Sequence, residues 1–207
     1  MKKAFLGLAL LALTASLFAA SATVVSVKGK VEVERNGEWI AVNPGDTIDE
    51  KEVVSTGFQS ECIVKYNDSV LQLAPLSRVT LSKLASSSKR DVVDVYLNTG
   101  AVRAKVTHSD IKKVNYAVRN PVAVASVRGT EFSFFDNGSV VCIDGAVAVA
   151  PARFYKGNQV EAESVDDVEE PEDGESDATT EATDVDPYSP AGATVVAKGQ
   201  STSISSD

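Results

Sequence analysis

The sequence predicts an all-β protein built from many short antiparallel strands, arranged as a solenoid-like or sandwich module with a long acidic disordered loop. Apolar and polar residues alternate with a period of two through most of the chain, and Val, Ile, Thr, Tyr and Phe are frequent. Turn signals recur every eight to twelve residues, as in sandwiches, barrels and solenoids. No amphipathic stripe with helical spacing runs for ten residues in the body of the chain, so we expect no helix there.

The first 22 residues have the pattern of a secretory signal peptide. Met1 is followed by two lysines, residues 4–18 are almost wholly apolar, and Ala20 and Ala22 form a small-x-small motif. We expect cleavage between Ala22 and Thr23 and export to the periplasm or beyond; the pattern is typical of bacteria. An uncleaved N-terminal anchor is the alternative. No second apolar run of about 20 residues occurs, so we expect no membrane span after cleavage.

The body is expected to occupy residues 23–160 and begins with two strand pairs. A strand at Thr23–Val27 leads through a glycine turn to 31–34, and Asn36-Gly37 then predicts a tight hairpin with 38–42. Asn43-Pro44-Gly45-Asp46 is a typical turn sequence. Further strand-like runs lie at 61–66, 70–73, 79–84, 92–97, 101–106, 113–118, 123–127, 131–135, 140–143 and 146–149.

The negative charge of the chain is concentrated in one segment. The formal net charge is −9, yet residues 23–160 hold 17 basic and 15 acidic side chains, whereas residues 161–186 hold 13 acidic and no basic ones. Such a composition predicts disorder, so we interpret 161–192 as an acidic insertion and 193–207 as a closing hairpin of the same domain. The insertion is either a solvated spacer with weak divalent cation association, or a segment that docks on a basic partner or on this protein's own Lys89-Arg90 and Lys112-Lys113 corners.

Composition also excludes several functions. An acidic chain without a basic stripe is not expected to bind nucleic acid, and two Cys and one His cannot build zinc-finger or iron–sulfur sites. The lone histidine, His108, lies in a polar turn, and no nucleophile-elbow motif occurs. We therefore expect neither a cofactor, nor a metal site, nor enzymatic activity.

Cys62 and Cys142 are two thiols in a chain expected to be exported, where disulfides persist. Both lie in apolar phases of predicted strands. Two interpretations stay open: a disulfide between them, or two buried free thiols that pack as small apolar side chains.

Several motifs, in order, resemble the FecR domain family. Val127-Arg128-Gly129-Thr130-Glu131-Phe132 is similar to its V-x-G-T-x-F signature. Trp39, Gly45-Asp46 and Thr56-Gly57 are similar to its W…GD…TG series, and the segment before Gly100 resembles its L-x-x-G motif. The residues that carry the resemblance are Gly45, Asp46, Thr56, Gly57, Gly100, Val127, Gly129, Thr130 and Phe132.

The resemblance implies an extracytoplasmic β module that works through protein contacts, and it places Trp39 in the core. The best-known members join the domain to a membrane helix and a cytoplasmic anti-sigma segment; neither is expected here. We expect a protein-binding module for signalling or sensing in the bacterial cell envelope, whose partner is another envelope or extracellular protein held by a strand edge or by the acidic loop. The alternative is a structural or surface-assembly envelope protein without a signalling role.

Overall fold

The structure, a computed structural model, describes residues 20–155 and 193–204. Residues 1–19 of the expected signal peptide (1–22) and the whole of the expected acidic insertion (161–192) lie outside these residues. Within them the fold is almost wholly β, which confirms the predicted class: two sheets face each other, and the only helical element is the 3-10 turn Ala152–Phe154. In this part of the chain no helix is long and apolar enough to cross a membrane.

The eight-stranded sheet contains both cysteines and the phenylalanine-rich segment 131–135. Its order from one end is β4 (Thr47–Asp49), β1 (Ser21–Lys28), β6 (Glu61–Tyr66), β7 (Ser69–Leu73), β10 (Ala101–Lys105), β13 (Glu131–Phe135), β14 (Ser139–Asp144) and β17 (Ser201–Ser203). All its pairings are antiparallel.

The nine-stranded sheet lies opposite. Its order is β3 (Glu38–Ala41), β2 (Val31–Arg35), β5 (Val53–Thr56), β8 (Arg78–Ser86), β9 (Arg90–Thr99), β11 (Lys113–Arg119), β12 (Ala123–Val127), β15 (Ala146–Pro151) and β16 (Thr194–Ala197). One pairing departs from the predicted antiparallel pattern, because β9 and β11 run parallel. The chain leaves β9 for β10 in the other sheet and returns to β11 in the same direction.

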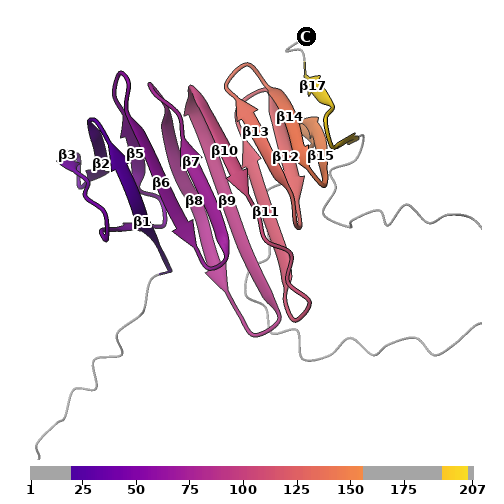
Figure 1. Ribbon diagram of the computed structural model, residues 1–207, viewed down its shortest axis with the longest axis horizontal. Helices are drawn as coiled ribbons and strands as arrows, with labels where there is room; N and C mark the ends of the chain where they lie inside the picture. Colours follow the sequence, from indigo (N-terminus) through magenta and orange to yellow (C-terminus); the bar gives the residue numbers. More distant parts are fainter. Residues whose placement is uncertain (1–19, 156–192, 205–207) are drawn as a thin grey trace, which may run out of the picture.

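Chain order and spatial order run together along the sandwich. In Figure 1 the colours pass from indigo at one end, through magenta, to orange at the other, as in a solenoid. The chain moves between the sheets as it advances, so the connections form two rims along the long sides. The sandwich therefore has two ends where strands lack a neighbour among the described residues: β3 and β4 at one end, β16 and β17 at the other.

The core lies between the sheets and follows from the period-two alternation. Every second side chain of each strand points inward, so one continuous apolar cluster runs the length of the sandwich, with Phe132 and Phe134 as its largest fully buried members. A small second cluster lies on the outer face of the nine-stranded sheet, where Tyr155 and Ala193 pack on Ala117, Val124 and Ala150. These two residues flank the acidic segment, so the chain leaves and re-enters the described fold over the same outer face.

Candidate functional site

Residues of the expected sequence signature join neighbouring connections to one another along each of the two rims. Thr56 Oγ1 donates to the carbonyl of Ala74 at 2.6 Å and accepts from the amide of Ser77 at 2.9 Å, while the Gly57 amide bonds the Lys30 carbonyl at 2.8 Å. Gly100 has φ +86°, and a Cβ there would lie 2.4 Å from Ser77 Oγ. These groups join successive connections of one rim.

The opposite rim carries the second half of the signature. A Cβ on Gly129 would lie 2.7 Å from His108 Cβ, so only glycine lets these two connections approach so closely. Thr130 Oγ1 donates to the carbonyl of Ala146 at 2.8 Å, and Val127 and Phe132 on either side are buried. In the same way, the Gly45 amide bonds the Val24 carbonyl at 2.8 Å. Each signature residue thus has a structural task.

The remaining signature residue, Asp46, and the three residues around the expected cleavage point lie near the start of the sandwich. Asp46 Oδ2 accepts from the amide of Asn43 at 2.8 Å and closes the predicted turn. Ala22 is buried and pairs with Ile48, Thr23 pairs with Lys65, and Ala20 packs on the core. The expected cleavage point therefore lies inside strand β1, which begins at Ser21.

The two cysteines are not joined. Both are free and buried, which decides between the two interpretations in favour of free thiols. Cys62 lies on β6 and Cys142 on β14, and β7, β10 and β13 lie between them. Four strand spacings of about 4.8 Å separate them by roughly 19 Å, far beyond the reach of a disulfide. Burial raises the pKa of the Cys62 thiol to about 11 and also raises that of Cys142.

Basic side chains from three connections gather around one hollow on the second rim. The hollow has a volume of about 440 Å³ and is lined by Lys89, Arg90, Lys112, Lys113 and Arg128 against a single carboxylate, Asp110. We refer to these five cationic residues as the basic hollow. The two basic pairs predicted as separate corners thus meet, because β11 pairs with β9 in parallel and places Lys113 opposite Arg90.

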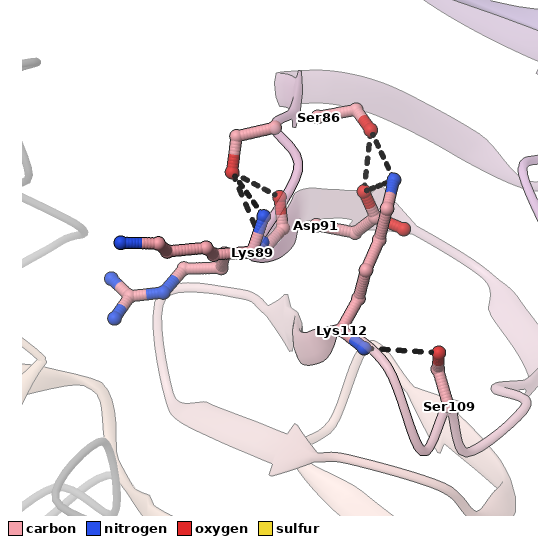
Figure 2. Close-up of polar contacts among 7 residues, drawn as sticks. Ser86, Lys89, Asp91, Ser109 and Lys112 are labelled. Atoms are coloured by element: carbon pink, nitrogen blue, oxygen red, sulfur yellow. Dashed lines mark hydrogen bonds and ion pairs between the residues drawn. The ribbon is translucent and has the colours of Figure 1, made fainter.

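Hydrogen bonds fix the backbone of the basic hollow. The Lys113 amide donates to the Lys89 carbonyl at 2.9 Å, and Ser87 Oγ accepts from the Arg90 amide at 3.0 Å. Lys112 Nζ lies 3.4 Å from Asp91 Oδ1 and 3.3 Å from Ser86 Oγ. Figure 2 shows Lys112 folded onto Asp91 and Ser86, with Lys89 pointing away from that ion pair. Among the described residues, no carboxylate lies within ion-pair distance of Lys89 or Lys113, so their charges remain available.

His108 also lines this hollow, next to the basic side chains. Its Nε2 lies 3.5 Å from Asp110 Oδ1, and both side chains are mostly exposed. No group of three His, Cys, Asp or Glu side chains suited to a metal ion occurs within residues 20–155 and 193–204.

The outermost strand of the nine-stranded sheet, β3, is a second candidate surface. All four of its residues are exposed, and Trp39 and Ile40 are 39% and 43% accessible. The expectation that Trp39 lies in the core is wrong: the indole stands at the sheet edge with the Arg78 guanidinium 5.1 Å from its ring centre. Trp39 pairs with Glu34 on β2, whereas the next pair along the strand contains the core residue Val33, so the indole lies on the outer face of the sheet.

Backbone groups on β3 are also available. The Val42 amide bonds the Val31 carbonyl at 3.0 Å, so this residue pair is hydrogen-bonded. Bonded and non-bonded pairs alternate in antiparallel strands, and Ile40 is therefore bonded to β2 as well. It follows that Trp39 and Ala41 direct their N–H and C=O groups to the free side of the sheet.

Comparison with known proteins identifies the domain. The model of the FecR family, described as "FecR protein", matches residues 52–148, from β5 to β15. Residues 52–148 form a FecR domain. The resemblance seen in the sequence motifs is thereby confirmed, and the matched segment of the FecR domain contains both Thr56-Gly57 and the Gly129-Thr130 signature.

Two solved structures are similar to part of this chain. Both are of a candidate anti-sigma factor from Parabacteroides distasonis ATCC 8503, with 19% and 18% sequence identity and TM-scores of 0.38 and 0.39. Each alignment covers 48% of this chain, and the chain spans 46% and 47% of those structures, less than half their length. No curated protein sequence matches the chain.

Proposed function

We propose that this FecR-domain chain is a non-enzymatic, exported module of the bacterial cell envelope, which binds another envelope protein in signalling or sensing. Membership of the FecR family supports a regulatory role. Among the described residues, neither His108 nor any acidic cluster has the arrangement of a catalytic or metal site, and the signature residues serve the fold. We propose recognition of a partner as the activity of the module.

The observation that carries this proposal is the open edge at β3. The backbone groups of Trp39 and Ala41 have no strand beside them among the described residues, and the exposed side chains of Trp39 and Ile40 flank these groups on the two faces of the sheet. An extended segment of a partner protein can add to such an edge, with main-chain hydrogen bonds for affinity and side-chain contacts for specificity. The occupant we propose is therefore an extended segment of the partner.

A substitution at Ala41 tests this mode of binding. Ala41→Pro removes the outward-facing amide and leaves the β2–β3 hydrogen bonds in place, since proline is tolerated at a free edge. Ala41→Ser keeps the amide and is the matched control. A photo-crosslinking amino acid replaces Glu38 in both backgrounds, in intact cells. A second probe replaces Phe58, which is 76% exposed on a rim connection.

We expect one protein adduct from position 38 and none from position 58. The yield of that adduct should fall at least about five-fold in Ala41→Pro and stay unchanged in Ala41→Ser. An adduct that survives Ala41→Pro in a chain with normal circular dichroism would contradict binding at the edge. Adducts to bulk envelope components or to further copies of this chain would instead favour the structural, surface-assembly alternative.

A further inference from the structure

We propose that the basic hollow is a binding site for an acidic polypeptide, and that its occupant is this chain's own segment Glu161–Asp186. This inference does not depend on the strand edge, because β8, β5 and β2 separate β3 from β9 in the nine-stranded sheet. Three independent observations support it: charge, distance and an unsatisfied buried amide.

The first observation is charge complementarity. Five cationic side chains and one carboxylate line the basic hollow. Lys112 is already held by Asp91, while Lys89 and Lys113 have no carboxylate partner among the described residues. The segment 161–186 carries 13 carboxylates and no cation. Opposite charges of this density attract one another most strongly where the surface is concave and partly shielded from water.

The distance to be crossed is short. Tyr155, the last described residue before the acidic segment, donates from its hydroxyl to Asp94 Oδ2 at 3.1 Å. On the same outer face, Arg90 lies four residues earlier on β9, about 13 Å along a strand. Glu161 follows Tyr155 by six residues, which reach about 20 Å when extended. The first acidic residues can therefore reach the basic hollow.

An unsatisfied amide lies on this route. Asn115 points to the same outer face of β11, between Lys113 and Ala117, and is 7% exposed. Within the part of the chain that the structure describes, neither its Nδ2 nor its Oδ1 has a hydrogen-bond partner. A buried amide without partners is costly, because it has lost its water. An extended backbone offers both a carbonyl and an N–H, which is what this side chain lacks, so a polypeptide fits the site better than a small anion does.

Tyr155 is itself firmly placed. Asp94 is buried and also accepts from Arg119 Nε at 2.9 Å, and the Arg119 guanidinium stacks 5.7 Å from the Tyr155 ring centre and 4.9 Å from that of Tyr96. The segment thus starts from a fixed point beside its proposed site. Tethering at such short range gives an effective concentration of the order of millimolar, enough to favour even weak contacts.

Zero-length carbodiimide crosslinking of the full chain tests the proposal. This reagent joins a lysine amine to a carboxylate in contact with it. We expect bonds from Lys89 and Lys113 to residues 161–186, several-fold more abundant than bonds from Lys65 and Lys105. The latter two lysines are exposed on the other sheet and serve as internal controls. The preference should disappear in about 1 M salt. Equal yields at all four lysines would overturn the proposal.

A peptide experiment separates binding within the chain from binding between chains. The probe is a synthetic peptide of residues 161–186, added to the intact chain and to a chain whose 13 acidic residues in that segment are changed to Asn or Gln. We expect binding to the neutralised chain, loss of that binding in Lys89→Gln/Lys113→Gln, and no loss in Lys65→Gln/Lys105→Gln. The intact chain should bind the peptide at least about ten-fold more weakly, because its own segment competes. Equal binding to both chains, or to neither, would refute docking within the chain.

Discussion

Gly100 gives the sharpest test of the role assigned to the rims. Its φ is +86°, and an added Cβ would meet Ser77 Oγ at 2.4 Å, Ser77 Cα at 2.7 Å and the Leu76 carbonyl oxygen at 2.8 Å. Two of these three atoms belong to the backbone and cannot rotate away. Gly37 is a matched control, because its φ is +83° and a Cβ there would meet nothing within 4 Å.

An alanine at either position would have to adopt a left-handed backbone conformation, but only at Gly100 would its Cβ also clash with neighbouring atoms. A left-handed conformation costs an alanine about 1–2 kcal/mol, which is the whole effect expected for Gly37→Ala. Overpacking adds about 1–3 kcal/mol at Gly100. We expect Gly100→Ala to lower the free energy of unfolding by about 2–5 kcal/mol in urea titrations followed by circular dichroism. If the two variants lost equal stability, the close approach of the rim connections would be refuted.

Three further predictions follow from the interior. Thr56→Val should lower the free energy of unfolding by about 1–3 kcal/mol in the same titration, because it leaves the buried Ser77 amide without an acceptor. Thr56→Ser keeps the hydroxyl and should retain most of this stability. Equal losses of stability in the two variants would contradict the hydrogen bonds described. Cys62 and Cys142 should both resist iodoacetamide at pH 8 in the folded chain and both react in urea, with the same intact mass before and after reduction; a two-unit mass difference would indicate a disulfide. Burial raises the pKa of Tyr116 and of Tyr155, where Asp94 adds to the effect, so the folded state binds these protons more tightly than the unfolded state does. The contribution of these tyrosines to stability should therefore be constant below about pH 10 and decrease above it. An absorbance titration should show both tyrosines ionising only as the protein unfolds. Ionisation near pH 10 without unfolding would argue against their burial.

Strand positions were predictable because alternation of apolar residues reports directly on burial. The runs at 61–66, 123–127 and 131–135 coincide with β6, β12 and β13, and Asn36-Gly37 forms the predicted hairpin turn with both residues at positive φ. Alternation specifies which face of a strand is buried, but not which strand lies beside it. The parallel pairing of β9 and β11 therefore gave no signal in the sequence.

The same limit explains why the sequence left the pairing of the cysteines open and why the basic hollow was missed. Cys62 and Cys142 have the right phase to face the core, yet strand order keeps them four strands apart. The family resemblance placed Trp39 in the core, but Trp39 pairs with Glu34 and is out of phase with the inward-facing Val33, on the last strand of its sheet. The Lys89-Arg90 and Lys112-Lys113 corners were visible in the sequence, whereas their union in one hollow depends on the parallel pair.

Amide hydrogen exchange on the module, alone and bound to the partner crosslinked at position 38, tests the central claim most directly. In the free chain we expect the amides of Trp39 and Ala41 to exchange fast and that of Ile40 to exchange slowly, because only the last is bonded to β2. Binding should protect Trp39 and Ala41 by a large factor. Protection elsewhere, with these two amides still exchanging freely, would contradict recognition through the edge strand.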